Sequence, residues 1–435
     1  MAKGKLKRIL VLVMACVLTL SLTTFSCGAM ASSDDSSVKV IKFFHRFPDD
    51  PYNSFIESKL HEYEAAHPDI KFEITSAQNQ DYKEKIKVVV GGDDTPDIFF
   101  SWAGDFTERF IRQNLILDLT PYFDSDPDWK DSLLENQMKI YTNDDGMIYG
   151  VPFRLDCKLF FYNTDIFNQY GLTAPTTFDE LLADCQTLLD AGVTPIAYGN
   201  QEPWAGLHYL GTLNQICVPD EIRAKDYDPT TGEFTDPGYL QALEYYQQLL
   251  PYMTPNADGV KPDMARSMFA MGQAAIYYGE LIEIPYIKSD ADDLNFGMFK
   301  FPEIEGAAGN QEILTGAPEG FMMSTTSKNP EAAEKFYKFL LSKEATSKFV
   351  KDVGAHVAVI GSVNKDNAYP TLVGAVELIN SVKGSAPWLD NAVNIKVADA
   401  FMRGCQAVAT GDKTIDQVIA DAQAAAKVVR SEAKK

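Results

Sequence analysis

The chain has 435 residues, 46% of them hydrophobic and 11% aromatic, and it carries a formal net charge of −22 at pH 7. This length is enough for two domains, and the apolar content predicts packed cores rather than disorder. The negative charge repels phosphate backbones and anionic lipid, which argues against nucleic acid as a partner, and its simplest role is to keep the protein soluble.

The N-terminus resembles a bacterial export signal. A basic start is followed by an apolar run over residues 9–22, which is shorter than the roughly 20 residues of a membrane-spanning helix. Residues 24–28 (TFSCG) resemble a lipobox, in which Cys27 would be acylated, although Thr24 stands where Leu or Val is preferred. We expect a signal peptide over 1–26, whose removal would take away four basic residues and leave a net charge of −26.

A competing cleavage site follows the lipobox. Residues 29–31 (AMA) form an A-x-A site, and cleavage there would release a soluble protein. We favour lipidation at Cys27, because residues 27–37 end in the polar run SSDDSS, which has the composition of a flexible tether. The expected location is the extracellular face of the bacterial cell membrane, with the lipid as anchor, or the periplasm.

After the tether, strand and helix patterns alternate. They cover residues 38–45, 54–66, 71–76, 82–90, 97–102 and 107–113 in turn. The order β-α-β-α-β indicates a mostly parallel sheet that is covered by helices. In such sheets ligands bind at the carboxyl ends of the strands, where His45, Gln78 and Trp102 stand.

The second half of the chain continues in the same α/β style. Residues 150–162 form a long extended segment, residues 194–198 form a strand, and further helices are expected at 178–191, 263–271, 331–341 and 414–429. No internal repeat and no long linker interrupts the chain after the tether. Two lobes that are joined by more than one crossing strand would explain that continuity.

Motifs of catalytic and metal sites are missing or incomplete. The sequence has no GxSxG, HExxH or GxGxxG motif. The acidic run that includes Asp124, Asp126 and Asp128 begins like a calcium loop, with Glu135 at its twelfth position, but Trp129 replaces the required glycine. We expect a surface acidic turn there, and neither a metal nor a cofactor in the protein.

The remaining cysteines leave their redox state open. Cys157, Cys185, Cys217 and Cys405 show neither a CxxC pair nor zinc-ligand spacing. Disulfide bonds would be stable in an exported protein, and buried free thiols are an equally good interpretation.

Several segments in order resemble one known family. They are residues 95–100 (TPDIFF), 145–152 (DGMIYGVP), 160–167 (FFYNTDIF), 170–172 (YGL), 177–182 (TFDELL) and 191–197 (AGVTPIA). Together they are similar to the extracellular solute-binding proteins of carbohydrate ABC importers, the family that includes maltose-binding protein. The resemblance covers essentially all of the chain after the tether. It implies a non-catalytic receptor, expected to be a monomer, that binds a carbohydrate and delivers it to the membrane permease subunits of an ABC importer.

The resemblance also implies a type II periplasmic-binding fold. In this α/β fold two lobes flank a cleft and close on the ligand by a hinge motion. The expected lobes are discontinuous: lobe 1 comprises 38–155 and 298–345, and lobe 2 comprises 156–297 and 346–435. The expected crossings lie near 151–162 and 296–301, with a return near 342–348.

Candidate contacts are residues that fit a sugar, whose rim of hydroxyls suits carboxylates and whose C–H face suits aromatic rings. Trp102 and Asp105 follow the third strand, where the family carries a similar Trp-Ala-x-Asp; core packing and helix capping are their alternative roles. Glu202 and Trp204 resemble the family's Glu-Pro-aromatic segment, with Glu202 accepting hydroxyls and Trp204 stacking. Asp156 lies where a family carboxylate often falls, and a salt-bridged acid is its alternative.

Other candidates are carried less directly by the resemblance. Glu280 is expected to contact a hydroxyl, but Leu281 replaces the aromatic residue that many relatives have there, so maltodextrin specificity is not transferred. Trp388 is the candidate replacement for that platform, with ordinary packing as its alternative. His45 and Arg46 end the first strand and are the remaining candidates.

Two other functions stay open at the level of sequence. The acids Asp105, Asp156, Glu202 and Glu280 include enough carboxylates for a secreted glycoside hydrolase. The same fold would also serve a peptide, a polyol or a phosphate ester, although the few basic residues among the candidates argue against an anionic ligand. Neither the sugar nor its length follows from the sequence.

Overall fold

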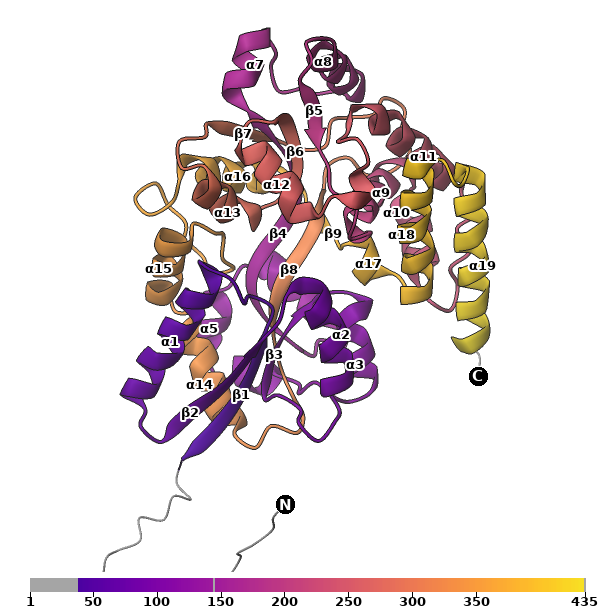
Figure 1. Cartoon of the computed structure of the whole chain (residues 1–435). Coiled ribbons are helices and arrows are strands. Elements are labelled where there is room, and N and C mark those ends of the chain that lie inside the picture. Colours follow the sequence, from indigo (N-terminus) through magenta and orange to yellow (C-terminus); the bar gives the residue numbers. More distant parts are fainter. Residues whose placement is uncertain (1–37, 144, 434–435) are drawn as a thin grey trace, which may run out of the picture. The chain divides into compact units, whose positions relative to one another are not determined.

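The computed structural model describes residues 38–143 and 145–433. The signal peptide, Cys27 and the tether that the sequence predicts lie outside the described residues. The predicted alternation of strands and helices is confirmed at the start of the described chain (Figure 1). The elements in this part are β1 (Lys39–His45), α1 (Tyr52–Ala66), β2 (Ile70–Ser76), α2 (Asn79–Val89), β3 (Ile98–Trp102) and α3 (Asp105–Arg112).

These elements build the first sheet. β1 pairs in parallel with both β2 and β3, so the strand order is β2-β1-β3. α1 buries the apolar face that its spacing predicts, including Phe55, Ile56 and Leu60. α2 ends just before Gly91, whose φ of 95° is a left-handed conformation that glycine adopts without steric strain.

Two long strands lie at the junction of the two sheets. They are β4 (Val151–Asn163) and β8 (Leu314–Met323), which lie antiparallel to each other in the middle of Figure 1. The first part of β4 pairs with β8, and its last part pairs with β6 (Ala274–Glu280) and β7 (Phe296–Phe299) of the second sheet. β8 continues to an antiparallel pairing with β3 of the first sheet. The chain therefore passes between the two sheets along β4 and again along β8.

The expected crossing near 151–162 coincides with β4, whereas the second one lies later than 296–301. Residues 296–299 form β7, which stays in the second sheet because it hydrogen-bonds along β4, where Phe299 stacks on Phe160 at 5.1 Å. The sequence also assigns 346–435 to the second lobe, but α15 (Lys343–Val353) packs against α1. Its Phe349 ring lies 4.9 Å from the ring of Phe55, which holds α15 beside the first sheet.

The second sheet carries helices on its faces. β5 (Thr194–Ala197) pairs in parallel with β6. The helices around it include α7 (Thr164–Tyr170), α8 (Phe178–Asp190), α9 (Trp204–Cys217), α10 (Asp220–Tyr227), α11 (Pro237–Leu249), α12 (Pro262–Ala270), α13 (Glu283–Asp290), α18 (Ile395–Thr410) and α19 (Ile415–Ala433). α8 begins with a reciprocal capping box between Thr177 and Glu180, which fixes its first turn.

The remaining α-helices and the last strand of the described chain follow. They are α4 (Thr120–Asp124), α5 (Pro127–Asp131), α6 (Glu135–Met138), α14 (Pro330–Leu340), α16 (Pro370–Ser381), β9 (Ser385–Ala386) and α17 (Leu389–Ala392). Among the described residues, no helix combines the length and the apolar character that crossing a membrane requires. Cys157, Cys185, Cys217 and Cys405 are all buried free thiols, which decides between the two interpretations of the sequence.

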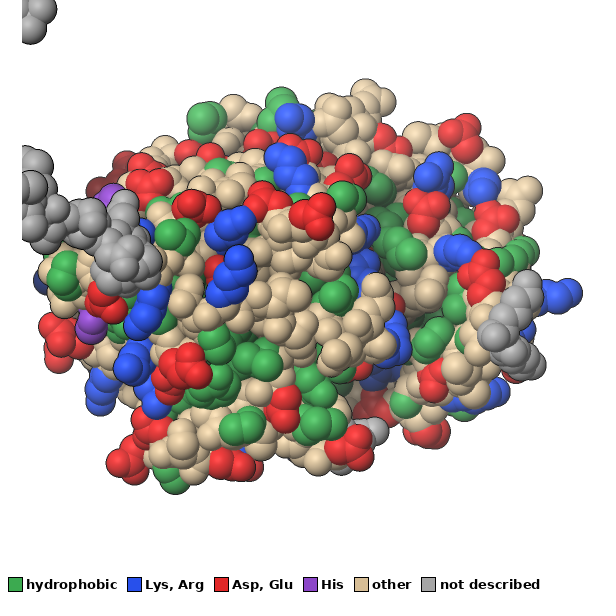
Figure 2. All heavy atoms as spheres, turned by 90° about the horizontal axis from the view of Figure 1, so that it is seen from below, with side chains coloured by type: hydrophobic (Ala, Val, Ile, Leu, Met, Phe, Trp, Pro, Cys, Tyr) green, Lys and Arg blue, Asp and Glu red, His purple; other side chains and the backbone are tan. Residues whose placement is uncertain are grey.

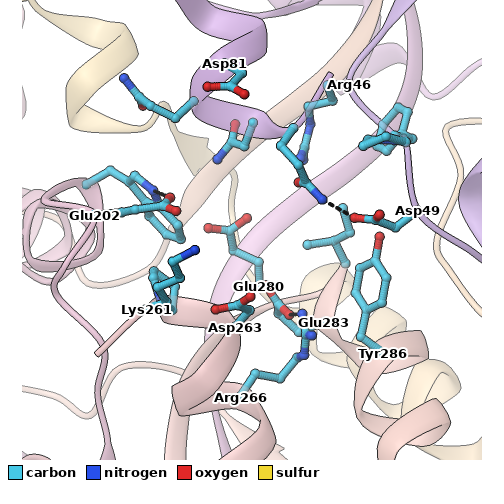
Figure 3. A pocket seen from close by; sticks show the side chains of 18 of the residues that line it. Arg46, Asp49, Asp81, Glu202, Lys261, Asp263, Arg266, Glu280, Glu283 and Tyr286 are labelled. Carbon is cyan, nitrogen blue, oxygen red and sulfur yellow. Dashed lines mark hydrogen bonds and ion pairs between the residues drawn. The ribbon is translucent and has the colours of Figure 1, made fainter. Parts of the chain in front are cut away.

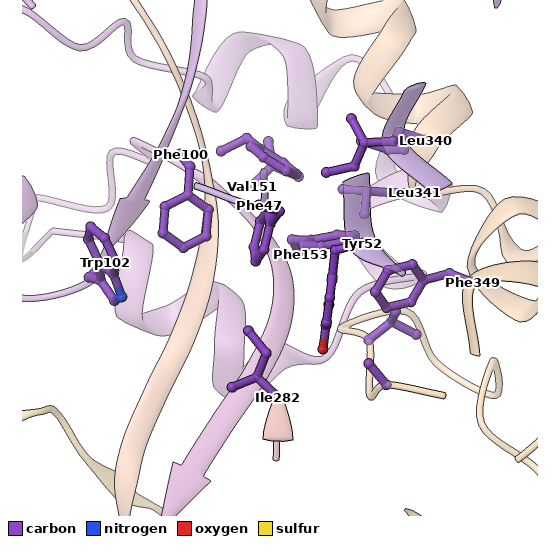
Figure 4. Close-up of a cluster of buried hydrophobic side chains, with 14 of the residues drawn as sticks. Phe47, Tyr52, Phe100, Trp102, Val151, Phe153, Ile282, Leu340, Leu341 and Phe349 are labelled. Atoms are coloured by element: carbon purple, nitrogen blue, oxygen red, sulfur yellow. The ribbon is translucent and has the colours of Figure 1, made fainter. Parts of the chain in front are cut away.

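Two apolar clusters hold the elements together. The first runs from the first sheet to one side of the second sheet, and Figure 4 shows its aromatic centre around Phe47, Tyr52 and Phe153. Phe47 and Tyr52 stack with their ring centres 5.2 Å apart. The second cluster lies around Phe160 and the helices α8, α9, α11, α18 and α19. Full burial of each large apolar side chain contributes about 1.5–3 kcal/mol, so these clusters fix the sheets that present the site.

Candidate functional site

A hollow of about 630 Å³ lies where elements of the two sheets meet (Figure 3). The segment after β1 and the start of α2 form one side, and the ends of β6 and the starts of α9, α12 and α13 form the other. Its lining includes Arg46, Asp49, Asp50, Gln78, Asp81, Glu202, Trp204, Lys261, Asp263, Arg266, Glu280, Glu283 and Tyr286. This volume is typical of pockets that enclose a small ligand.

Carboxylates dominate the charge of this hollow. Seven acidic residues line it (Asp49, Asp50, Asp81, Glu202, Asp263, Glu280 and Glu283), against three basic ones (Arg46, Lys261 and Arg266). Elsewhere on the surface the charges are mixed, and Figure 2 shows acidic and basic side chains interspersed over one face. The hollow therefore offers many hydrogen-bond acceptors and repels a ligand of net negative charge.

Glu202 and Trp204 come from the turn that starts α9. Pro203 is the residue before the first helical position, so Trp204 begins the helix with a half-buried ring. The indole Nε1 donates to Glu202 Oε2 at 2.6 Å, which ties the carboxylate and the ring into one unit. Figure 3 shows Glu202 on the side of the hollow opposite Tyr286, with Glu280 between them. This pair presents an acceptor and an aromatic surface side by side.

Trp388 lies behind this pair and not in the hollow. Its side chain is only 3% exposed, and its ring stacks on the imidazole of His208 with 4.5 Å between centres. His208 in turn lies 5.0 Å from the ring of Trp204. Trp388 therefore supports the position of Trp204 through His208 and presents no free face to a ligand.

Glu280 ends β6 and reaches into the hollow. Its Oε1 lies 3.4 Å from Lys158 Nζ and 3.2 Å from His208 Nδ1. Burial would raise the pKa of Glu280, but Lys158 and His208 together hold this pKa well below its usual value, so the group is a carboxylate. The following residue, Leu281, is 1% exposed and packs in the first apolar cluster, so it supplies no platform in the hollow.

Arg46 lines the hollow, whereas its neighbours His45 and Trp102 do not. Arg46 Nη2 donates to Glu319 Oε1 at 2.9 Å, and its guanidinium carbon lies 5.4 Å from the centre of the Trp102 ring. Trp102 is 4% exposed and packs edge-on against Phe100 at 4.9 Å. His45 is fully buried, and burial lowers its pKa to about 4, so the imidazole is neutral at pH 7.

Asp105 and Asp156 are engaged in ion pairs away from the hollow. Asp105 stands in the first turn of α3 and accepts from Arg112 Nη2 at 2.7 Å, while Gly104, at a φ of 94°, precedes the helix. Asp156 is fully buried and accepts from Arg154 Nη2 at 3.2 Å. Burial raises the pKa of Asp156 above its usual value although Arg154 opposes the shift. For Asp156 the structure therefore shows the alternative role that the sequence offered, a salt-bridged acid.

The structure thus brings four of the sequence-based candidates together. Arg46, Glu202, Trp204 and Glu280 line one hollow, and His45, Trp102, Asp105, Asp156 and Trp388 lie outside it. Tyr286 on α13 also lines the hollow, although it is not among the sequence-based candidates. Its ring lies 4.7 Å from the guanidinium of Arg266, which also donates to Glu283 at 2.9 Å. This tyrosine lies inside a short helix and has no motif around it. The sequence therefore gives no signal that its ring lines the hollow.

The sheets and the hollow define an α/β molecule of two lobes with a ligand-sized space between them. The family model of the bacterial extracellular solute-binding proteins matches residues 49–347. The multiple sugar-binding protein of Streptococcus mutans is 24% identical over 366 residues, which cover 79% of this chain and 81% of that protein. An uncharacterized ABC transporter extracellular-binding protein of Pyrococcus horikoshii is 23% identical over 365 residues, covering 79% of this chain and 78% of that protein.

Solved structures agree on the fold. A chitin oligosaccharide binding protein superposes with a TM-score of 0.83 at 23% identity, covering 91% of this chain and 100% of that one. Since the family model spans more than half of the sequence, the chain belongs to the family of bacterial extracellular solute-binding proteins. The family that the motifs indicated and the two-lobed α/β fold that it implied are both confirmed.

Proposed function

We propose that the protein is the extracellular substrate-binding lipoprotein of an ABC importer, which captures a sugar or oligosaccharide and delivers it to the membrane permease. The observation that carries this proposal is the composition of the hollow, where Glu202, Trp204 and Glu280 meet. Carboxylates accept hydrogen bonds from sugar hydroxyls, and an indole ring packs on the apolar face of a pyranose. The names of the Streptococcus mutans relative and of the chitin oligosaccharide binding protein point to the same class of ligand.

Within this proposal, two aromatic rings of the second lobe face the ligand. Trp204 begins α9, and Tyr286 lies on α13, where burial raises the pKa of its phenol to about 12 and keeps it a neutral hydrogen-bond donor. Arg46, Glu202 and Glu280 supply the polar contacts. The lobes hinge along β4 and β8, because β4 pairs in both sheets and β8 joins β4 to β3.

A panel of purified sugars tests this proposal. Thermal shift should identify at least one neutral mono- or oligosaccharide that raises the melting temperature, because a ligand specific to the folded protein stabilises it. Isothermal titration calorimetry then gives its dissociation constant, and polyols and peptides serve as competing classes of ligand. Stabilisation by one of these classes with no response to any saccharide would overturn the sugar assignment.

The glycoside hydrolase alternative makes a different prediction. Its general acid needs a raised pKa, whereas Lys158 and His208 beside Glu280 hold the pKa of this carboxyl low. We therefore expect the purified protein to release no reducing sugar from the saccharide that it binds. Release that stops on Glu202→Gln or Glu280→Gln substitution would establish a hydrolase instead.

Lipidation at Cys27 is the remaining part of the proposal. Cys27→Ser should move the protein from the membrane fraction to the medium or periplasm, since it removes the proposed lipid anchor. Mass spectrometry of the N-terminal peptide distinguishes the two processing sites, as an acylated Cys27 differs from a chain that starts after Ala31. A wild-type protein that begins at Ser32 without lipid would contradict this part.

A further inference from the structure

A second hollow of about 620 Å³ adjoins the first. The two share Gln80, Glu202 and Trp204 in their linings, so the turn at the start of α9 forms the boundary between them. The walls of the second hollow come from α2 on one side and from α17 and α18 on the other. Apart from Glu202 and Trp204, no sequence-based candidate lines it.

Two helix faces supply its side chains. On α2, Gln80, Lys83 and Lys87 are three and four residues apart, which places them on one face. On α18, the same spacing brings Asp399 and Arg403 together toward the hollow. These positions are fixed by regular helix geometry and by the packing of α17 against α18 and α3.

The charge of this second hollow is reversed relative to the first. Four cations line it (Lys83, Lys87, Lys396 and Arg403), against three carboxylates (Glu202, Asp390 and Asp399). Most of these cations have a partner in the protein: Lys83 pairs with Asp390 at 2.7 Å, Arg403 with Asp399 at 2.9 Å, and Lys396 with Glu432 at 2.5 Å. A net positive lining is notable in a chain whose net charge is −22.

Lys87 is the cation without such a partner. Within the described residues no carboxylate lies within ion-pair distance of its ammonium group, and the side chain is exposed. Burial lowers the pKa of Lys87, and the nearby cations Arg109 and Lys83 lower it further, while Glu84 opposes the shift. An anion that entered the hollow would relieve this repulsion.

Part of the lining of the second hollow is apolar. Phe106 and Trp204 contribute rings, and Met402 adds a flexible apolar side chain. A bare inorganic anion would not use this surface, whereas a sugar ring that carries an acidic group would place its C–H face on it. The lining thus suits an anionic group that is attached to a saccharide.

We propose that the second hollow is a subsite for an anionic substituent of the saccharide, with Lys87 and Arg403 as its charged contacts. This inference rests on the proposed sugar-binding function and deepens it: the neutral part of the ligand occupies the acidic first hollow, and the acidic part passes Trp204 into the second. A uronic acid carboxylate, a sulfate ester and a phosphate ester share the required charge.

Calorimetry with matched pairs of probes tests the subsite. The pairs are galactotriose with trigalacturonate, xylotriose with xylotriose bearing one glucuronic acid branch, galactose with galactose 6-sulfate, and glucose with glucose 6-phosphate. At least one acidic probe should bind about 10-fold more tightly than its neutral partner, and the difference should shrink at high salt, where charges are screened. The pair with the largest difference identifies the acidic group.

Variants of Lys87 make the test specific to this hollow. Lys87→Gln should remove the preference for the acidic probe and leave the affinity for its neutral partner unchanged, whereas Lys87→Arg should keep the preference. Lys383→Gln, which removes an exposed cation far along the chain that pairs with Glu312, is the matched control. Equal or tighter binding of the neutral partner in every pair overturns the subsite alone, and so does an equal loss for both probes in Lys87→Gln. Failure of all saccharides to bind overturns the proposed function itself.

Discussion

Trp204 is the residue on which most of the site depends. It borders both hollows, donates to Glu202 and is supported from behind by His208. Trp204→Ala should weaken the binding of the saccharide found in the panel by about 10- to 100-fold, as truncation of a central aromatic contact costs roughly 1–3 kcal/mol. Calorimetry measures the loss, and Trp204→Phe should recover part of the affinity.

As a control, Trp129→Phe alters a ring that stacks on Phe123 outside both hollows, and affinity should not change. An unaltered affinity of the Trp204→Ala protein would remove this residue from the site.

Tyr286 makes a separate prediction at the same scale. Its ring lines the acidic hollow and lies against the guanidinium of Arg266, so it is held in place without a ligand. Tyr286→Ala should weaken binding by about 10-fold or more through loss of a stacking surface. Tyr286→Phe separates stacking from hydrogen bonding, because only the hydroxyl is lost. Equal affinities of all three proteins in calorimetry would show that Tyr286 does not contact the sugar.

The sequence identified part of this site for a physical reason. Glu202 and Trp204 lie in a turn between a strand and a helix, where a local motif fixes which side chains project together. Trp102 stands in a similar motif, but its neighbours Phe100 and Arg46 cover the ring and bury it. Tyr286 and Lys87 lie on helices whose facing surfaces are set by packing between segments far apart in the chain, which no local pattern encodes.

At the scale of elements, the strands β4 and β8 are joined by buried charges. Arg154 on β4 pairs with Asp156 and with Glu319 on β8, and Glu319 also accepts from Arg46 after β1. Glu319→Gln leaves two buried guanidinium groups with less neutralising charge, so it should lower the free energy of unfolding by about 3–5 kcal/mol. The matched control is Glu312→Gln, which breaks the exposed pair with Lys383 and should cost less than about 1 kcal/mol. Chemical denaturation compares the two, and similar losses would contradict a structural role of the buried pairs.

The same two strands explain where prediction of the fold succeeded and where it failed. Alternating or periodic apolar residues located β1, α1, β2, α2 and β3, since burial of one face leaves a local pattern. The position of the second crossing between the sheets depends on which strand a short apolar strand pairs with. Residues 296–299 pair with β4 because Phe299 stacks on Phe160, and this long-range choice is invisible in the local pattern.

At the scale of the whole molecule, two buried histidines link stability to pH. His45 and His356 have pKa values lowered to about 4, mainly by burial and, for His356, also by Arg154. Their unfolded pKa is about 6.5, so the unfolded chain takes up protons first as the pH falls. The stability that they contribute is therefore complete above about pH 6.5 and is lost as the pH falls toward 4. Asp156 acts in the opposite direction, because its raised pKa contributes stability at low pH that is lost as the pH rises.

The melting temperature should thus fall as the pH is lowered from 6.5 to 4.5. Protonation of the two histidines in the unfolded chain should contribute to this fall. The difference between the folded and unfolded pKa values corresponds to a loss in the free energy of unfolding. This loss is at most about 3 kcal/mol for each histidine once the pH reaches the folded pKa. Calorimetric scans of the double variant His45→Gln and His356→Gln should give a shallower slope over this window, even if its melting temperature at pH 7.5 is lower. His61→Gln, which alters an exposed imidazole, should keep the wild-type slope. A double variant that loses stability with acid as steeply as the wild type would contradict this role of the histidines. The acid sensitivity would then come from carboxylates such as Glu280 and Asp390. Their pKa values are lowered in the folded protein although burial opposes the shift.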